Sequence, residues 1–273
     1  MIVSRDKHLF RFRGDNVNTI SELVNKSIWH SKVDGLNDPL ELFFNLDADG
    51  LSKLGKDDIA RIIKNNAAFR QSPNFFRRCF VRNELEPIYN MIREHWNEEF
   101  VGEMISEFRQ KTAVACFTKT FDSRLMWGYY GNGMKGICFA YNKEKLSNSG
   151  LEFTDVKYVD EAPKVNIYKH LAESLSGAKL TIDADFAVCK HKDWEKEEEV
   201  RSLKYLKGDD VYKNNPGESI LLNENCVDAI IVGERLHGDM RTFLEDYSKR
   251  NDIYLLVAKA NFNNYKIQIE NLY

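Results

Sequence analysis

Two short apolar runs constrain the fold of this chain more than any other feature of its sequence. Residues Thr112 to Thr118 and Gly136 to Tyr141 are apolar without the polar alternation of a strand that has one wet face. Such runs are typical of strands covered on both faces at the centre of a sheet. Further strand patterns lie at 9–13, 27–31, 153–159, 219–222, 227–233, 253–258 and 265–269. The sequence therefore predicts a mostly antiparallel central sheet.

Segments with helical spacing separate these strand patterns. Asn16 or Asn18 offers an N-cap to a short helix, and apolar side chains recur almost every fourth position over 85–108, which predicts one long helix. Residues 165–192 and 240–248 are also predicted to be helical. Because no strand pattern occurs between 56 and 110, we expect one α+β domain, residues 1–273, whose sheet is flanked by helices and which carries a helical insertion at about 56–110.

The composition excludes several classes of protein. The 273 residues are 43% hydrophobic and 30% charged, which is typical of a folded globule. No run approaches the roughly 18 to 20 apolar residues of a membrane span, and the N-terminal residues have no apolar signal core. Five cysteines, an odd number without a C-x-x-C pair, argue against a disulfide framework or a zinc ribbon. We expect a cytoplasmic protein with no membrane partner.

The net charge of -3 gives no general attraction to nucleic acid. A local cluster of basic residues fits either a basic patch or the solvated face of a helical hairpin. Its members are Lys64, Arg70, Arg77, Arg78 and Arg82. Upstream, Asn45 to Gly50 imitates the opening of a calcium loop, but Lys56 stands where the bidentate glutamate belongs, so no metal site is expected there.

The stretch from Trp194 to Arg201 has the charge pattern that stands out most. If it is an extended strand, Glu197, Glu199 and Arg201 share one face, because successive strand side chains point to opposite sides. Charged groups in line either form a solvated edge or line a polar cleft. The cleft is our working hypothesis, and a charged edge strand or the first turn of a helix is the alternative.

Two other segments offer groups that suit a polar cleft. Residues 125–136 mix aromatic side chains with glycines, so Trp127 and Tyr130 are candidates for stacking on a planar group such as a base or nicotinamide. A core aromatic cluster beneath a glycine turn is an equally open interpretation. In the loop 35–41, Pro39 restricts Asp38 to extended conformations, which suits a rigid loop that presents Asn37 and Asp38.

Several of these motifs together resemble a bacterial family, domain-of-unknown-function family 2971. The motifs are Phe10 to Arg13, Ile28 to Ser31, Leu36 to Glu41, Cys116 to Thr118, Met126 to Tyr130, Lys135 to Phe139, and Trp194-x-x-Glu197-x-Glu199-x-Arg201. They follow the family order over most of the chain. The resemblance implies no established activity.

A more distant resemblance is to mono-ADP-ribosyltransferases. That family places a basic residue on an early strand, a Ser or Tyr on a second strand and a glutamate on a late strand, and Arg13, Ser31 and Glu199 follow this order. Glu197 completes an E-x-E pair. The spacing departs from the family pattern, and a clear Ser-Thr-Ser motif is absent.

This resemblance implies an enzyme that uses NAD as substrate and cleaves or transfers at the nicotinamide-ribosyl bond, in bacterial defence or toxin biology. Glu199, with Glu197 and Ser31, would be catalytic, and its carboxylate would stabilise an oxocarbenium-like ribose. An arginine clamps a pyrophosphate well, a role for Arg13 or Arg201. The remaining candidates for binding the nucleotide are Trp127, Tyr130, Asn37 and Asp38. The acceptor, whether protein or nucleic acid, is not specified.

Two other functions stay open at the level of sequence. Arg13 and Arg201 facing a pair of glutamates fit a buried ion network in a non-catalytic module that binds a nucleotide or a partner. Carboxylates also suit magnesium, and Asp38, Glu41, Glu197 and Glu199 would serve a metal-dependent phosphodiesterase. No His or Asp triad with recognisable metal-ligand spacing supports this third hypothesis.

Overall fold

The computed structural model describes residues 2–47, 49–66, 69–174, 184–206 and 216–272. The chain divides into two compact units. The first, the sheet unit, comprises Met1–Pro39, Lys111–Tyr158 and Lys192–Tyr273, and the second, the helical unit, comprises Leu40–Gln110 and Val159–His191. Each unit is described by itself.

Ten strands of the described residues form one sheet in the sheet unit. They are β1 (His8–Arg13), β2 (Ser27–Lys32), β4 (Thr112–Thr118), β5 (Ile137–Asn142), β6 (Thr154–Asp155), β10 (Glu199–Tyr205), β11 (Gly217–Leu221), β12 (Val227–Gly233), β13 (Tyr254–Asn261) and β14 (Lys266–Asn271). Eight of them follow the order β11-β2-β4-β1-β5-β12-β13-β14, while β10 pairs with β4 and β6. All pairs are antiparallel except β12 with β13, which helix α9 (Asp239–Asn251) connects.

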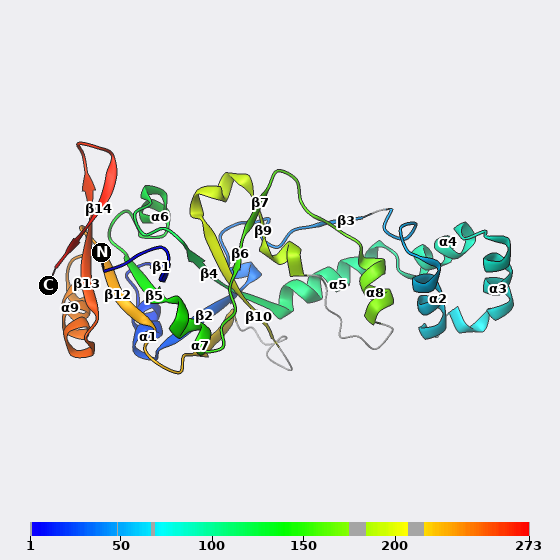
Figure 1. Ribbon diagram of the computed structural model, residues 1–273, viewed down its shortest axis with the longest axis horizontal. Helices are drawn as coiled ribbons and strands as arrows, with labels where there is room; N and C mark the ends of the chain where they lie inside the picture. The colour runs from blue at the N-terminus through cyan, green and yellow to red at the C-terminus, as the bar shows by residue number, and fades with distance from the viewer. Residues whose placement is uncertain (1, 48, 67–68, 175–183, 207–215, 273) are drawn as a thin grey trace. The chain divides into compact units, whose positions relative to one another are not determined.

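Both faces of this sheet are buried. On one face, which we call the α9 side, Leu9, Phe117 and Val200 pack with Leu23 of helix α1 (Val17–Val24) and Leu244 of α9. Helix α7 (Lys143–Asn148) covers the same face, and Figure 1 shows α1, α7 and α9 below the strands in that view.

The opposite face is covered by helix α6 (Arg124–Tyr129), which lies above the strands in Figure 1. On this α6 side, Phe10 and Phe12 pack with Met126 and Trp127. Burial on both faces explains why the central strands have continuous apolar sequences instead of alternating ones.

The helical unit has its own core. Its elements are β3 (Asn45–Leu46), α2 (Lys56–Asn65), η2 (Phe69–Gln71), α3 (Pro73–Arg82), α4 (Glu86–His95), α5 (Glu98–Lys111, whose last residue belongs to the sheet unit), β8 (Lys164–Val165), α8 (Ile167–Ser174), η3 (Ala184–Val188) and β9 (Cys189–His191). Apolar side chains at helical spacing, such as Ile59 and Ile62 of α2 and Ile88 and Ile92 of α4, build this core. Strands β3 and β8 pair in parallel.

The predicted fold class, α+β with a mostly antiparallel sheet flanked by helices, is confirmed. The regular elements described between Lys56 and Lys111 are helical, and their role as an insertion at about 56–110 stays a prediction. Whether residues 1–273 act as a single domain stays a prediction. None of the helices in the described part of the chain has the length and apolarity needed to cross a bilayer.

Three predicted elements are wrong in extent. The long helix over 85–108 is broken between α4 and α5, because Trp96 leaves the helical conformation and the side chain of Asn97 accepts a hydrogen bond from the Phe100 amide, which starts a new helix. The strand predicted at 153–159 is two short strands, β6 and β7 (Lys157–Val159). The helix predicted over 165–192 ends with α8, 184–191 form η3 and β9, and 175–183 lie outside the described residues.

Candidate functional site

The acidic stretch is not one continuous strand. Residues Lys192–Glu197 form a 3-10 helix, η4, and β10 begins only at Glu199. The prediction of an extended strand from Trp194 is therefore wrong up to Glu198. The carboxylates of Glu197 and Glu199 nevertheless both become buried, at 9% and 4% exposure, while the side chain of Glu198 is 43% exposed.

The backbone of Glu198 makes the change from η4 to β10. It is left-handed, with φ of 45°, a conformation that is uncommon for residues other than glycine. Its amide donates to the Glu195 carbonyl at 3.1 Å, and its carbonyl accepts from the Lys119 amide at 3.0 Å. Because of this tight turn, Glu197 at the end of η4 and Glu199 at the start of β10 are both buried, although only one residue separates them.

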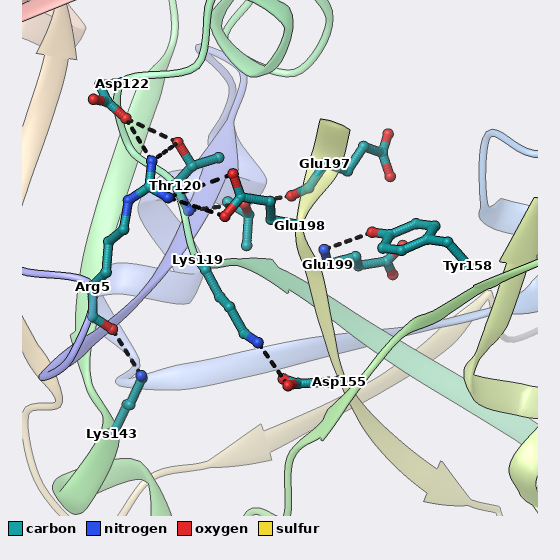
Figure 2. A network of polar contacts seen from close by, with 11 residues as sticks. Arg5, Lys119, Thr120, Asp122, Lys143, Asp155, Tyr158, Glu197, Glu198 and Glu199 are labelled. Atoms are coloured by element: carbon teal, nitrogen blue, oxygen red, sulfur yellow. Dashed lines mark hydrogen bonds and ion pairs between the residues drawn. The ribbon is translucent and has the colours of Figure 1, made fainter. Parts of the chain in front are cut away.

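Arg5, in the N-terminal segment before β1, binds the side-chain carboxylate of Glu198. As Figure 2 shows, its guanidinium lies between the Glu198 carboxylate, at 3.1 Å, and Asp122, at 3.3 Å, and it also donates to the Thr120 hydroxyl. Lys143 donates to the Arg5 carbonyl at 2.8 Å. This exposed network ties the turn at Glu198 to the loop that follows β4.

Glu199 and Arg201 form a buried ion pair on β10. The Arg201 Nε donates to Glu199 Oε1 at 2.8 Å and its Nη2 to Oε2 at 3.3 Å, and the two side chains are 0% and 4% exposed, respectively. The Glu199 amide also donates to the Tyr158 hydroxyl at 2.8 Å. A bidentate contact of this kind fixes both side chains, because the planar guanidinium group matches the geometry of a carboxylate.

A second polar chain leads from the surface to Glu197. The Tyr130 hydroxyl donates to Glu197 Oε1 at 2.5 Å and accepts a hydrogen bond from the exposed Asn37 amide at 2.8 Å. Tyr130 itself is half-buried, and the Thr118 hydroxyl donates to the Glu197 carbonyl. Asn37, Tyr130 and Glu197 therefore form a continuous path of hydrogen bonds from solvent to a buried carboxylate.

Sheet register decides which other predicted residues share this face. Phe10 pairs with Thr118, which pairs with Glu199, and Ser31 pairs with Val114, which pairs with Leu203. Side chains of directly paired residues lie on the same face, so Ser31 is on the face of Glu199 and Arg201. Its hydroxyl donates to the Lys32 carbonyl at 3.1 Å. Asp38, next to Asn37, is buried at 8% exposure.

Arg13 is on the opposite face, which corrects its predicted place beside Glu199. It shares the α9 side with Leu9 and Arg11, because it is an even number of residues from each on β1. There it forms an ion pair with Glu22 of α1, which also contacts Arg11 Nη1 at 3.0 Å. Arg13 and Glu199 therefore do not face one crevice.

Trp127 is a core residue, which corrects its predicted role as a stacking surface. It is 1% exposed, its ring meets Phe12 edge-on at a centroid distance of 5.0 Å, and its Nε1 donates to the Phe121 carbonyl at 2.8 Å. No ring face is left for a ligand at this level of burial. Trp127 therefore fits the interpretation of this segment as a core aromatic cluster. Tyr130, by contrast, takes part in the hydrogen-bonded chain that joins Asn37 to Glu197.

A buried histidine lies on the α9 side near Arg11. The His30 Nδ1 is 3.2 Å from the Ile28 carbonyl, which can only accept, so Nδ1 carries the proton and Nε2 accepts from the Ser202 hydroxyl at 3.2 Å. Burial, reinforced by the positive charge of Arg11, lowers the pKa of His30 to about 4. The imidazole is therefore neutral at physiological pH. Burial, followed by the charge of Arg13, also lowers the pKa of Arg11.

Sequence reasoning missed three contributors to the site. Arg5 contacts the carboxylate of Glu198, and the Tyr158 hydroxyl accepts from the amide of Glu199. Both residues are remote in sequence from these glutamates, and no spacing in the sequence predicts the contacts. Thr118 ends an apolar strand, and a polar residue at that position was the available signal. Its pairing with Glu199 depends on the register between β4 and β10, which the sequence does not state.

The calcium-like segment is closed by an internal ion pair. The Asp47 carboxylate contacts Lys53 Nζ at 2.7 Å, and this hydrogen bond lowers the pKa of Asp47. Within the residues that the structure describes, no group of three or more His, Cys, Asp or Glu side chains is arranged to hold a metal ion.

Comparison with known proteins gives one match. A family model with the description "Protein of unknown function (DUF2971)" matches residues 126–202. This segment runs from α6 to β10, and it contains Tyr130, Glu197, Glu199 and Arg201. Searches of the curated proteins and of the solved structures gave no match.

Proposed function

We propose that this protein is an enzyme that cleaves the nicotinamide-ribosyl bond of NAD and passes the ADP-ribosyl group to water or to another acceptor, with Glu197 as the reacting carboxylate. The observation that carries the proposal is the hydrogen-bonded path from Asn37 through Tyr130 to Glu197. It joins a buried carboxylate to a half-buried aromatic ring and an exposed amide, the types of group that a nucleotide site needs.

This proposal moves the catalytic role from Glu199 to Glu197. Glu199 is held at two points by a fully buried arginine, so its charge is already compensated within the chain. Glu197 accepts a hydrogen bond from the Tyr130 hydroxyl, which orients its carboxylate toward the half-buried ring and the exposed Asn37. A carboxylate held in a fixed orientation can stabilise a positive charge that develops beside it.

The chemical step follows from this arrangement. The bond between the pyridine nitrogen and ribose C1 breaks, its electron pair leaves with nicotinamide, and positive charge develops on C1 and the ring oxygen. The Glu197 carboxylate stabilises that charge, and it then takes the proton lost by the water or hydroxyl that attacks C1. The Tyr130 ring stacks on the nicotinamide, and Asn37 at the surface donates to the ribose or the phosphates.

The roles of the other predicted residues change accordingly. The Glu199 and Arg201 pair supports the start of β10, and Arg13 is no longer assigned as a pyrophosphate clamp. Ser31, on the same face of the sheet as Glu199, and Asp38, next to Asn37, stay secondary candidates. We retain the cytoplasm as the expected location, where NAD is abundant, and bacterial defence or toxin biology as the proposed setting.

Incubation of the full chain with NAD labelled in the nicotinamide ring tests this function. We expect labelled nicotinamide to be released in proportion to protein concentration. The absence of release with NAD, under conditions in which the protein is folded by circular dichroism, would contradict the proposed reaction.

A second function, non-catalytic binding of a nucleotide or a partner, is favoured by a specific observation. The guanidinium groups of Arg11, Arg13 and Arg201 are each engaged in ion pairs with glutamates of the same chain, as expected for a structural network. This function predicts that labelled NAD or another nucleotide is retained by the protein without release of nicotinamide. A magnesium-dependent phosphodiesterase has no supporting carboxylate cluster among the described residues, and we do not propose it.

A further inference from the structure

The C-terminal strand β14 lies at an edge of the large sheet. It is the last strand in the order β12-β13-β14, and it pairs with β13 from Leu256↔Asn271 to Asn261↔Lys266. Among the described residues, no strand pairs with its other edge. Figure 1 shows this hairpin in red at the margin of the sheet unit. An edge strand of this kind presents backbone N–H and C=O groups to a further strand.

Packing fixes the register of this strand. Ile267 and Ile269 point to the α6 side of the sheet, where they pack on the core that contains Trp127 and Leu256. Lys266, Gln268 and Glu270 alternate with them and are exposed. Because a slip by one residue would expose both isoleucines, the outer edge offers the same groups in the same order in every copy.

The sequence of β14 is complementary to itself when a second copy runs antiparallel. A two-fold axis through Gln268 places Lys266 opposite Glu270 of the second copy, and Ile267 opposite Ile269. Opposite charges and apolar side chains that face each other directly across antiparallel strands stabilise the pairing. Charged residues usually protect an edge from other strands, but here a second copy of β14 would place opposite charges beside both Lys266 and Glu270.

The hairpin tip adds exposed aromatic surface at the end of this edge. The residues Phe262 and Tyr265 are 88% and 78% exposed, and the guanidinium of Arg124 lies 6.0 Å from the centre of the Tyr265 ring. In the two-fold register, Tyr265 is opposite Asn271 of the second copy, so each tip lies beside the end of the other β14. Aromatic and arginine side chains are enriched in protein interfaces.

We propose that β14 is a homodimer interface, in which two copies of the chain pair their β14 strands antiparallel about Gln268 and join their sheets. A second copy is the partner that this edge fits, because the charge pattern is matched by its own reversal. The interface is isologous and closed, as for most homodimers. It is independent of the proposed reaction.

Charge reversal tests the register. The wild-type chain is expected to be a dimer by size-exclusion chromatography with light scattering at micromolar concentration. Lys266→Glu places glutamate opposite glutamate twice per dimer, and Glu270→Lys places lysine opposite lysine, so each variant is expected to raise the dimer dissociation constant at least tenfold. The double variant Lys266→Glu with Glu270→Lys restores opposite charges and is expected to restore the dimer.

A matched control keeps the test specific. Lys259 on β13 contacts Glu270 within the same chain, so Lys259→Gln removes that ion pair without changing the outer edge of β14, and it is expected to leave the dimer intact. A monomeric wild-type chain overturns the proposal. A dimer that resists both single reversals, or one that the double variant fails to restore, also overturns it.

Discussion

Replacing Glu199 by glutamine removes one charge from a deeply buried ion pair and keeps the shape of the side chain. The partner, Arg201, is fully buried, and two of its donors point at the Glu199 carboxylate at 2.8 and 3.3 Å. Glutamine can accept at one oxygen only, and its amide group presents hydrogens toward the guanidinium. The variant therefore leaves a buried positive charge without its compensating carboxylate.

The expected cost follows from that burial. Removing one partner of a buried ion pair lowers the free energy of unfolding by about 3–5 kcal/mol, because the remaining charge stays desolvated and loses the attraction of that partner. For a chain of this size, about 3 kcal/mol corresponds to a fall of roughly 6–12 °C in the melting temperature. A substitution away from buried networks costs less than about 0.5 kcal/mol.

Urea unfolding followed by circular dichroism measures this effect. Glu198→Gln is the matched control, because it removes a neighbouring carboxylate whose ion pair with Arg5 is about half exposed on both sides and contributes about 0–1 kcal/mol. The double variant Glu199→Leu with Arg201→Met removes both charges and is expected to recover most of the lost stability. If Glu199→Gln unfolds at the same urea concentration as the control, the proposed structural role of this pair is refuted.

Three further predictions follow from the same contacts. The folded-state pKa of His30, about 4, lies below its unfolded value of about 6.5, so the unfolded chain binds a proton first as the pH falls. The contribution of neutral His30 to the free energy of unfolding is complete above pH 6.5. Roughly 2–3 kcal/mol of it is lost by about pH 4.5. Urea unfolding at both pH values should show a smaller loss for His30→Gln, and an equal loss would contradict this. Glu198 has a left-handed backbone, so thermal unfolding should show Glu198→Gly to be more stable than Glu198→Ala by about 1 kcal/mol. Both variants lose the contact with Arg5, but only alanine strains the backbone. The reverse order of stability would refute the strain argument. Tyr130→Phe removes the hydrogen bond to Glu197 and should lower the rate of nicotinamide release by about 10- to 100-fold, whereas an unchanged rate would remove the tyrosine from the site.

The sequence predicts the sheet well because its strands carry a strong local signal. The strand ending at Thr118 and the strand through Phe139 are buried on both faces, so each is a continuous apolar run bounded by polar residues or glycine. The sequence predicts helix α1 with Asn16 or Asn18 as its N-cap, and the structure shows that Asn16 is the cap, because its side chain accepts a hydrogen bond from the Thr19 amide. Local patterns of this kind do not depend on the rest of the fold.

Breaks in regular structure were harder to predict. The apolar stripe passes through Trp96 and Phe100 at a spacing of four, so the periodicity continues across the gap between α4 and α5. Asn97 was the available cap signal. At Glu198, nothing in a run of acidic residues announces a left-handed backbone, which is more usual for glycine or asparagine.

The candidate site was predicted only in part because its composition depends on long-range register. Tyr130 and Glu197 were both candidates, and the structure brings them into contact. The placement of Arg13 away from Glu199 depends on β4 separating β1 from β10 and on which residues pair across it. A shift of one residue in either pairing would reverse the faces, and no local pattern reports that shift.

The most direct measurement compares nicotinamide release by Glu197→Gln and Glu195→Gln. Both glutamates lie on η4, but Glu195 is exposed and outside the polar chain, which makes it a matched control for charge and position. We predict that Glu197→Gln lowers the release rate by about 100-fold or more while it remains folded, and that Glu195→Gln retains the wild-type rate. Equal release by the two variants would contradict the central claim that Glu197 is the reacting carboxylate.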